Sequence, residues 1–112
     1  MAVQVLVQQK GPLPITVNFK APSDSPCCLV VNGSVWTQSA NNMIGIQVQV
    51  DGKTIGQANI FSNTASTHRA VVPAYFPIQL KYGVQHTLVL SAVPGTTTVS
   101  DFNDFFTAVI NY

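Results

Sequence analysis

The stretch MIGIQVQVDGKTIGQANIFS, residues 43–62, decides the fold class of this chain. Branched apolar residues take every second position in its first half, and they are Ile44, Ile46, Val48 and Val50. A period of two places these side chains on one face of an extended strand, an alignment that a helix does not give. Asp51-Gly52 follows directly, and this pair favours a two-residue type I′ turn because both central positions need a positive φ. The stretch therefore predicts a β-hairpin whose second strand returns through residues 53–62.

The rest of the chain extends this prediction. Segments rich in branched and aromatic residues recur at a spacing of about ten to twelve residues, with turn residues between them. They cover residues 3–8, 15–20, 28–36, 68–75, 76–82, 85–92 and 105–112. Only 8% of the 112 residues are charged and none is Glu, a composition that disfavours surface helices. We expect residues 1–112 to form a single all-β domain, an antiparallel β-sandwich of jelly-roll type with about eight to nine strands.

The charge balance and the hydropathy limit the partners. A formal net charge of +1 gives no electrostatic basis for binding nucleic acid. No run of about eighteen apolar residues is present, so no membrane insertion is expected. The first ten residues have neither a basic start nor a continuous apolar centre, so no signal peptide is expected. These features predict a protein that is cytoplasmic or exported by a non-classical route.

Several short motifs carry a resemblance to a known group of β-sandwich domains. They are Gly33-Ser34-Val35-Trp36, Val50-Asp51-Gly52-Lys53, Thr67-His68-Arg69, residues 83–90 (GVQHTLVL) and residues 101–106 (DFNDFF) with the strand that follows. On these motifs the segment from Gly33 to Tyr112 resembles bacterial jelly-roll domains of the tumour-necrosis-factor-like and C1q-like type. The resemblance implies a ligand-binding or assembly module that often trimerises, and lectin activity occurs among bacterial domains that look like this. A carbohydrate or protein partner and a homo-trimer are what it leads us to expect.

Three residues in the middle of the chain are candidates for ligand binding. Trp36 directly precedes the polar segment 37–42, and an exposed indole at this position would stack on a sugar ring. The alternative is that Trp36 lies in the core. His68 and Arg69 are adjacent, and the fixed fork of guanidinium donors suits an anion or a carbohydrate. The alternative for His68, and also for His86, is a structural role near the end of a sheet, without a paired acid.

A second group of candidates lies in the segment 101–104. Asp101, Asn103 and Asp104 place three oxygen-bearing side chains within it. Such a composition occurs in loops that bind calcium or sugar, although the Gly and terminal Glu of an EF-hand loop are missing. It is more typical of a turn whose Asp and Asn side chains bond to the nearby backbone.

The adjacent Cys27 and Cys28 predict no disulfide framework. Neighbouring residues of a strand point to opposite faces, so a bond between these two sulfur atoms is not expected. We expect two free thiols, one of them buried, with redox chemistry or intermolecular pairing as the alternative. Two cysteines and two distant histidines offer too few ligands for a metal, so neither a metal site nor a cofactor is predicted.

These observations lead to one functional hypothesis and two rivals. The first is a non-enzymatic binding module for carbohydrate or a cell-surface ligand, using loops at one end of the sandwich. Its predicted site residues are Trp36, His68, Arg69, Asp101, Asn103 and Asp104. The alternative is a structural, self-assembling or antigenic surface protein with no small-molecule ligand, which the low charge and the aromatic C-terminal strand favour. A hydrolase that uses His68 or His86 ranks third, since no Gly-x-Ser-x-Gly motif is present.

Overall fold

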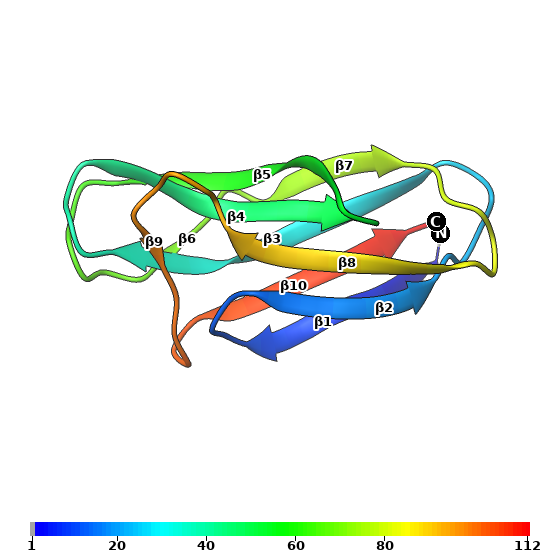
Figure 1. The fold of residues 1–112 in the computed structure, drawn as a ribbon, viewed down its shortest axis with the longest axis horizontal. Helices are drawn as coiled ribbons and strands as arrows, with labels where there is room; N and C mark the ends of the chain where they lie inside the picture. The colour runs from blue at the N-terminus through cyan, green and yellow to red at the C-terminus, as the bar shows by residue number, and fades with distance from the viewer. Residues whose placement is uncertain (1) are drawn as a thin grey trace.

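The computed structural model describes residues 2–112 as two antiparallel β-sheets packed face to face (Figure 1). The strands are β1 (Val3–Lys10), β2 (Ile15–Lys20), β3 (Cys27–Thr37), β4 (Asn42–Val50), β5 (Lys53–Ser62), β6 (Arg69–Ala70), β7 (Ala74–Ile78), β8 (Gln85–Ala92), β9 (Thr98–Val99) and β10 (Phe105–Asn111). Strands β1, β10, β3, β6, β7 and β9 form the larger sheet, and β2, β8, β4 and β5 the smaller. The predicted all-β sandwich is confirmed. No helix that could cross a membrane occurs in the described part of the chain.

Strand β3 is the longest strand and the centre of the larger sheet. β10 and then β9 pair along one of its edges, while β7 and then β6 pair along the other. The chain leaves the first edge after β9 and rejoins it at β10, so residues 100–104 form a loop that protrudes from the sheet between these strands. In Figure 1, β6 and β9 lie at the end of the sandwich away from the two termini.

The hairpin of β4 and β5 forms as predicted. β4 pairs with β5 from Asn42↔Ser62 to Val50↔Lys53, and Asp51 and Gly52 have φ values of 53° and 80°, as the two-residue turn requires. All four alternating apolar residues of β4 are buried. β8 pairs with β4 on the side away from β5, so the hairpin and β8 together form most of the smaller sheet.

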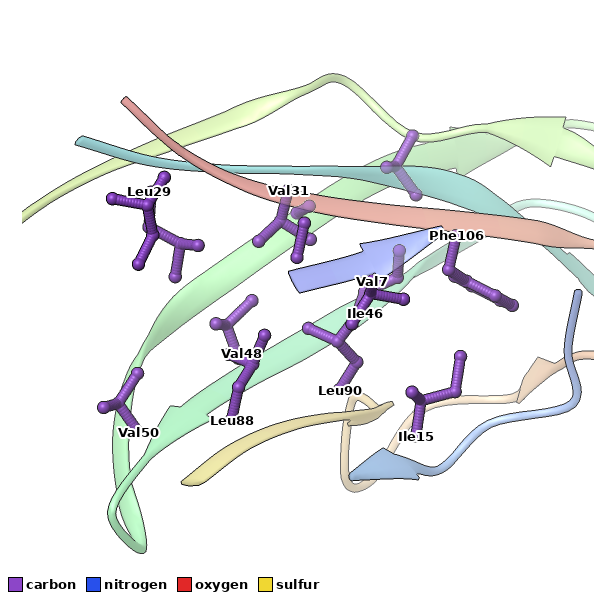
Figure 2. Packing of buried hydrophobic residues seen from close by; sticks show 14 of the residues in the cluster. Val7, Ile15, Leu29, Val31, Ile46, Val48, Val50, Leu88, Leu90 and Phe106 are labelled. Atoms are coloured by element: carbon purple, nitrogen blue, oxygen red, sulfur yellow. The ribbon is translucent and has the colours of Figure 1, made fainter. Parts of the chain in front are cut away.

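The core lies between the two sheets and is filled mainly by aliphatic side chains, together with Phe19, Phe106 and Cys27 (Figure 2). Leu29, Val31 and Phe106 reach it from the larger sheet, and Ile46 and Leu90 meet them from the smaller. Each of these side chains is at most 1% exposed, and burying one such side chain contributes about 1.5–3 kcal/mol. The alternation of β3, β4, β8 and β10 therefore explains why the two sheets adhere.

The bounds of two predicted strands were wrong, and a third strand contains a bulge. Residues 68–75 do not form one strand, because only Arg69 and Ala70 pair with β3 before Pro73 interrupts the chain. The strand predicted at 76–82 begins and ends earlier, as β7. In β1 a bulge between Val5 and Val7 changes the side-chain phase, so Val3 and Val5 are exposed and Val7 alone is buried.

Strand β3 runs without a turn through Asn32-Gly33. A Cβ atom at Gly33 would lie 2.5 Å from the ring of Phe106. The glycine is thus needed for the close approach of β10. The prediction for the cysteines is confirmed, since Cys27 is buried, Cys28 half-buried and both are free.

Candidate functional site

Three stretches far apart in the sequence meet on the outer face of the larger sheet, where β6 and β9 flank β3. Ser34 and Trp36 alternate on β3 with Val35 and Thr37, which are fully buried and face inward, and so they point outward. His68 lies just before β6, and Asp101 and Asp104 belong to the loop between β9 and β10. We call Ser34, His68, Asp101 and Asp104 the His68 cluster.

The carboxylate of Asp104 is the centre of the His68 cluster and is fully buried. Its Oδ1 accepts a hydrogen bond from Ser34 Oγ at 2.7 Å and lies 2.7 Å from His68 Nδ1. Its Oδ2 accepts from the backbone N–H of Asp101 at 2.9 Å. Buried carboxylates are tolerated only when they are bonded in this way, so Asp104 ties β3, the loop and His68 together.

His68 lies above the buried carboxylate with 36% of its side chain exposed. Because the Asp104 carboxylate is an acceptor, His68 Nδ1 donates this hydrogen bond. The bond is the main cause that raises the pKa of His68, and the nearby charges of Asp104 and Asp101 act in the same direction. On the far side of the ring, Nε2 is 4.0 Å from Asp101 Oδ2. The Trp36 ring lies 5.8 Å from the His68 ring, centroid to centroid, at an angle of 49°.

The loop 101–104 is shaped by its own polar side chains. Asp101 Oδ1 accepts from the backbone N–H of Asn103 at 2.8 Å, and the Asp104 N–H donates to the Asp101 carbonyl at 3.1 Å. These bonds confirm the prediction of turn chemistry in this segment. They leave Asp101 Oδ2 and the exposed Asn103 side chain facing outward.

The structure separates Arg69 from this group. Arg69 pairs with Val35, whose side chain points into the core, whereas Ala70 pairs with the outward-facing Ser34. Paired residues of an antiparallel ladder share a face, so Arg69 and His68 lie on opposite faces. This register does not support a joint role for these two adjacent residues, which stays a prediction. Trp36, His68, Asp101 and Asp104 do converge, with Asn103 at the tip of the same loop.

Beside the His68 cluster the outer face has a hollow of about 230 Å³, which the sequence prediction missed. Its lining consists of Asn32, Gly33, Ser34, Ala70, Phe105 and Thr107. We call it the Phe105 hollow. It shares Ser34 with the His68 cluster, and its one aromatic residue, Phe105, is 45% exposed. The signal available in the sequence was the alternation of β10, which puts Phe105 and Thr107 on the face opposite to Phe106.

A second histidine–carboxylate pair occurs at the other end of the sandwich. Asp51 Oδ2, in the turn between β4 and β5, lies 2.7 Å from His86 Nδ1, and Asp51 Oδ1 accepts from the Thr87 N–H at 2.9 Å. The bond to His86, followed by the one to Thr87, lowers the pKa of Asp51. Neither histidine of the chain therefore lacks a paired acid, contrary to the expectation from spacing. The carboxylates lie 35 and 36 residues away in sequence, which hides both pairs.

The hydrogen-bond order in the His68 cluster does not match a hydrolytic triad. In a triad the histidine bonds to the serine and the acid bonds to the histidine. Here Ser34 and His68 both bond to the same oxygen of Asp104, so the Ser34 hydroxyl donates to the carboxylate and not to the imidazole. The arrangement suits the binding of a ligand or a cation through the outward-facing atoms of His68 and Asp101.

Comparisons with known proteins identify the fold. No family model matches this chain. No curated protein matches it. Among solved structures, dimeric latent PorU from Porphyromonas gingivalis contains a similar region, with a TM-score of 0.54 and 13% identity over 97% of this chain, which spans 12% of the length of that protein.

Smaller proteins align at lower TM-scores. The carbohydrate-binding module CBM36 in complex with calcium and xylotriose gives 0.45, with 13% identity over 99% of this chain and 98% of that one. The C-terminal domain of EclA, a sugar-binding protein, gives 0.48, with 15% identity over 98% and 77%. At such identities the similarity concerns the fold alone. These comparisons do not show the resemblance to tumour-necrosis-factor-like and C1q-like domains, which stays a prediction.

Proposed function

We propose that this chain is a non-enzymatic carbohydrate-binding module whose ligand occupies the Phe105 hollow and the rim of the His68 cluster. One observation carries the proposal: a single hollow brings an exposed aromatic ring together with the Asn32 amide and the Thr107 hydroxyl. This combination suits a sugar, because the C–H faces of sugars pack on aromatic rings and their hydroxyls form hydrogen bonds with amides and hydroxyls. Asn32 Oδ1 accepts from the Gly33 N–H at 2.8 Å, which holds the amide in place.

The size of the hollow favours a small ligand or one residue of a longer chain. Pockets for drug-sized ligands enclose about 300–1,000 Å³, more than the 230 Å³ found here. The exposed atoms of His68 and Asp101 adjoin the hollow through Ser34 and Asp104, so a second sugar residue would reach them. The sugar-binding proteins of known structure share at most the fold with this chain. They are a reason to test carbohydrate as the first class of ligand.

The test is a glycan array probed with labelled protein, followed by calorimetric titration of the best glycan. Phe105→Ala should weaken binding about tenfold or more, because aromatic anchors dominate small binding sites. Asn32→Ala should weaken it as well. Tyr82→Ala is the matched control: this tyrosine is 63% exposed and lies beyond β7 at the opposite end of the sandwich, so its loss should leave affinity unchanged. Absence of any glycan ligand, or equal affinity of Phe105→Ala and the parent, contradicts the proposal.

A second candidate function, self-association, is favoured by another part of the same sheet face. The register places Val5, Val109, Val30 and Tyr75 side by side across β1, β10, β3 and β7. Val5 and Tyr75 at the ends of this apolar row are 53% and 67% exposed. The row contains no charge, so a second copy of the chain can cover it without burying an unpaired ion.

A further inference from the structure

The outer part of the His68 cluster has the features of a site for a metal ion. Ligand atoms of His68, Asp101 and Asp104 lie within 4.8 Å of one another. Sequence spacing predicted no metal site, because the residues come from two separate segments. The hydrogen bonds of the three side chains show which of them would contact an ion and which would only orient another of these side chains.

Asp104 is the orienting residue. Both of its oxygens are already engaged, and the carboxylate is fully buried. Its bond to His68 Nδ1 fixes the hydrogen of the neutral imidazole on that nitrogen, so the lone pair is on Nε2. A carboxylate behind a histidine is the usual outer support of a metal ligand, because it fixes the tautomer and makes the ligand nitrogen more basic.

Two outward-facing atoms remain as ligands, His68 Nε2 and Asp101 Oδ2, 4.0 Å apart. Asp101 is oriented in the same manner as His68, since its Oδ1 is held by the Asn103 N–H. Zinc bonds to histidine nitrogen and carboxylate oxygen are about 2.0–2.2 Å long, and two such ligands of a tetrahedral ion are about 3.4 Å apart. A shift of about 0.6 Å in these half-exposed side chains would therefore close the site, with water completing the coordination.

We propose that His68 Nε2 and Asp101 Oδ2 bind a divalent transition-metal cation of the Zn²⁺ class, with Asp104 as the positioning residue. The imidazole nitrogen selects this class over calcium and magnesium, which prefer all-oxygen sites. The site adjoins the Phe105 hollow, but the inference does not depend on a sugar ligand. An ion bound here would also hold the loop 101–104 against His68.

The experiment is a calorimetric titration of Zn²⁺ into tag-free, chelator-treated protein in the absence of any glycan. One equivalent should bind, and both His68→Ala and Asp101→Asn should weaken binding about tenfold or more. His86→Gln is the matched control, because His86 also has an aspartate at Nδ1 but has a carbonyl oxygen, that of Lys81, 3.5 Å from Nε2. It should bind Zn²⁺ as the parent does.

A second readout uses Trp36, the single tryptophan of the chain, whose ring is 5.8 Å from that of His68. Co²⁺ at His68 should quench its fluorescence in the parent and in His86→Gln, but not in His68→Ala. The inference is overturned if no Zn²⁺ binds, if His68→Ala binds as the parent does, or if only His86→Gln loses binding. Each of these results leaves the Phe105 hollow to be tested separately by glycan binding in the presence of EDTA.

Discussion

At the scale of single residues, Asp104 organises the outer face of the larger sheet. It is one of two carboxylates hydrogen-bonded to a histidine ring in the described part of the chain, and of these two only Asp104 is fully buried. Its partners are a β3 hydroxyl, a histidine before β6 and a backbone N–H of its own loop. The side chain therefore acts on both the stability of the fold and the orientation of His68.

Asp104→Ala should lower the free energy of unfolding by about 3 kcal/mol, because the change leaves three donors without their charged acceptor. Ser34→Ala removes one of the three bonds and should lower it by about 1 kcal/mol. Urea denaturation followed by Trp36 fluorescence measures both. An Asp104→Ala variant as stable as Ser34→Ala would show that the buried carboxylate does not hold the loop.

At the scale of elements, the turn between β4 and β5 is attached to β8 by Asp51. The carboxylate bonds to His86 and to the Thr87 N–H, and the same residue has the positive φ that the turn requires. Its lowered pKa means that folding favours the ionised form. This contribution is present above the unfolded value of about 3.8 and is lost as the pH falls through the lower folded value.

Asp51→Asn should consequently be less stable than the parent at neutral pH, and the difference should shrink on acidification to below pH 3.8. Asparagine keeps the shape and tolerates the positive φ of the turn, so the comparison isolates the charge. Thermal unfolding of both proteins at about pH 7 and about pH 3 provides the measurement. A stability difference that stays constant between the two pH values would mean that ionisation of Asp51 contributes nothing.

At the scale of the whole molecule, the two faces of the larger sheet differ in kind. The inner face belongs to the core, while the outer face holds the Phe105 hollow, the His68 cluster and the uncharged row from Val5 to Tyr75. The smaller sheet has a different outer face, on which Gln47, Gln49 and Asn18 alternate with the buried positions. Both the proposed ligand site and the proposed contact between copies thus lie on one side of the sandwich.

Light scattering coupled to size exclusion should therefore detect an oligomer at high protein concentration, with the trimer expected from the jelly-roll resemblance. Tyr75→Lys should shift the mass towards the monomer, because it places a charge on the apolar row. Tyr75 belongs to neither the Phe105 hollow nor the His68 cluster. Tyr82→Lys is the control, since Tyr82 is equally exposed but lies away from the row. A parent protein that stays monomeric, or a Tyr75→Lys variant with unchanged mass, removes self-association as a function.

The local part of the fold follows from the sequence alone. Alternation in residues 44–50 and the Asp51-Gly52 pair specified a hairpin, and the structure forms it in that register. The low charge and the apolar period of two likewise specified an all-β chain, because this period places one apolar face on each strand and helices need a different spacing. These properties depend on neighbours in the chain, so a sequence displays them.

The site was decided by tertiary structure. Ser34 and Asp104 are 70 positions apart, and a hydrogen bond between them depends on where the chain leaves the edge of β3 between β9 and β10. The separation of Arg69 from His68 is also a consequence of register, because pairing with Val35 turns the arginine to the inner face. Sequence thus determined which residues form strands and which face of each strand is apolar. Only the packing of distant strands determined which polar side chains meet, since that depends on register and loop path rather than on local preference.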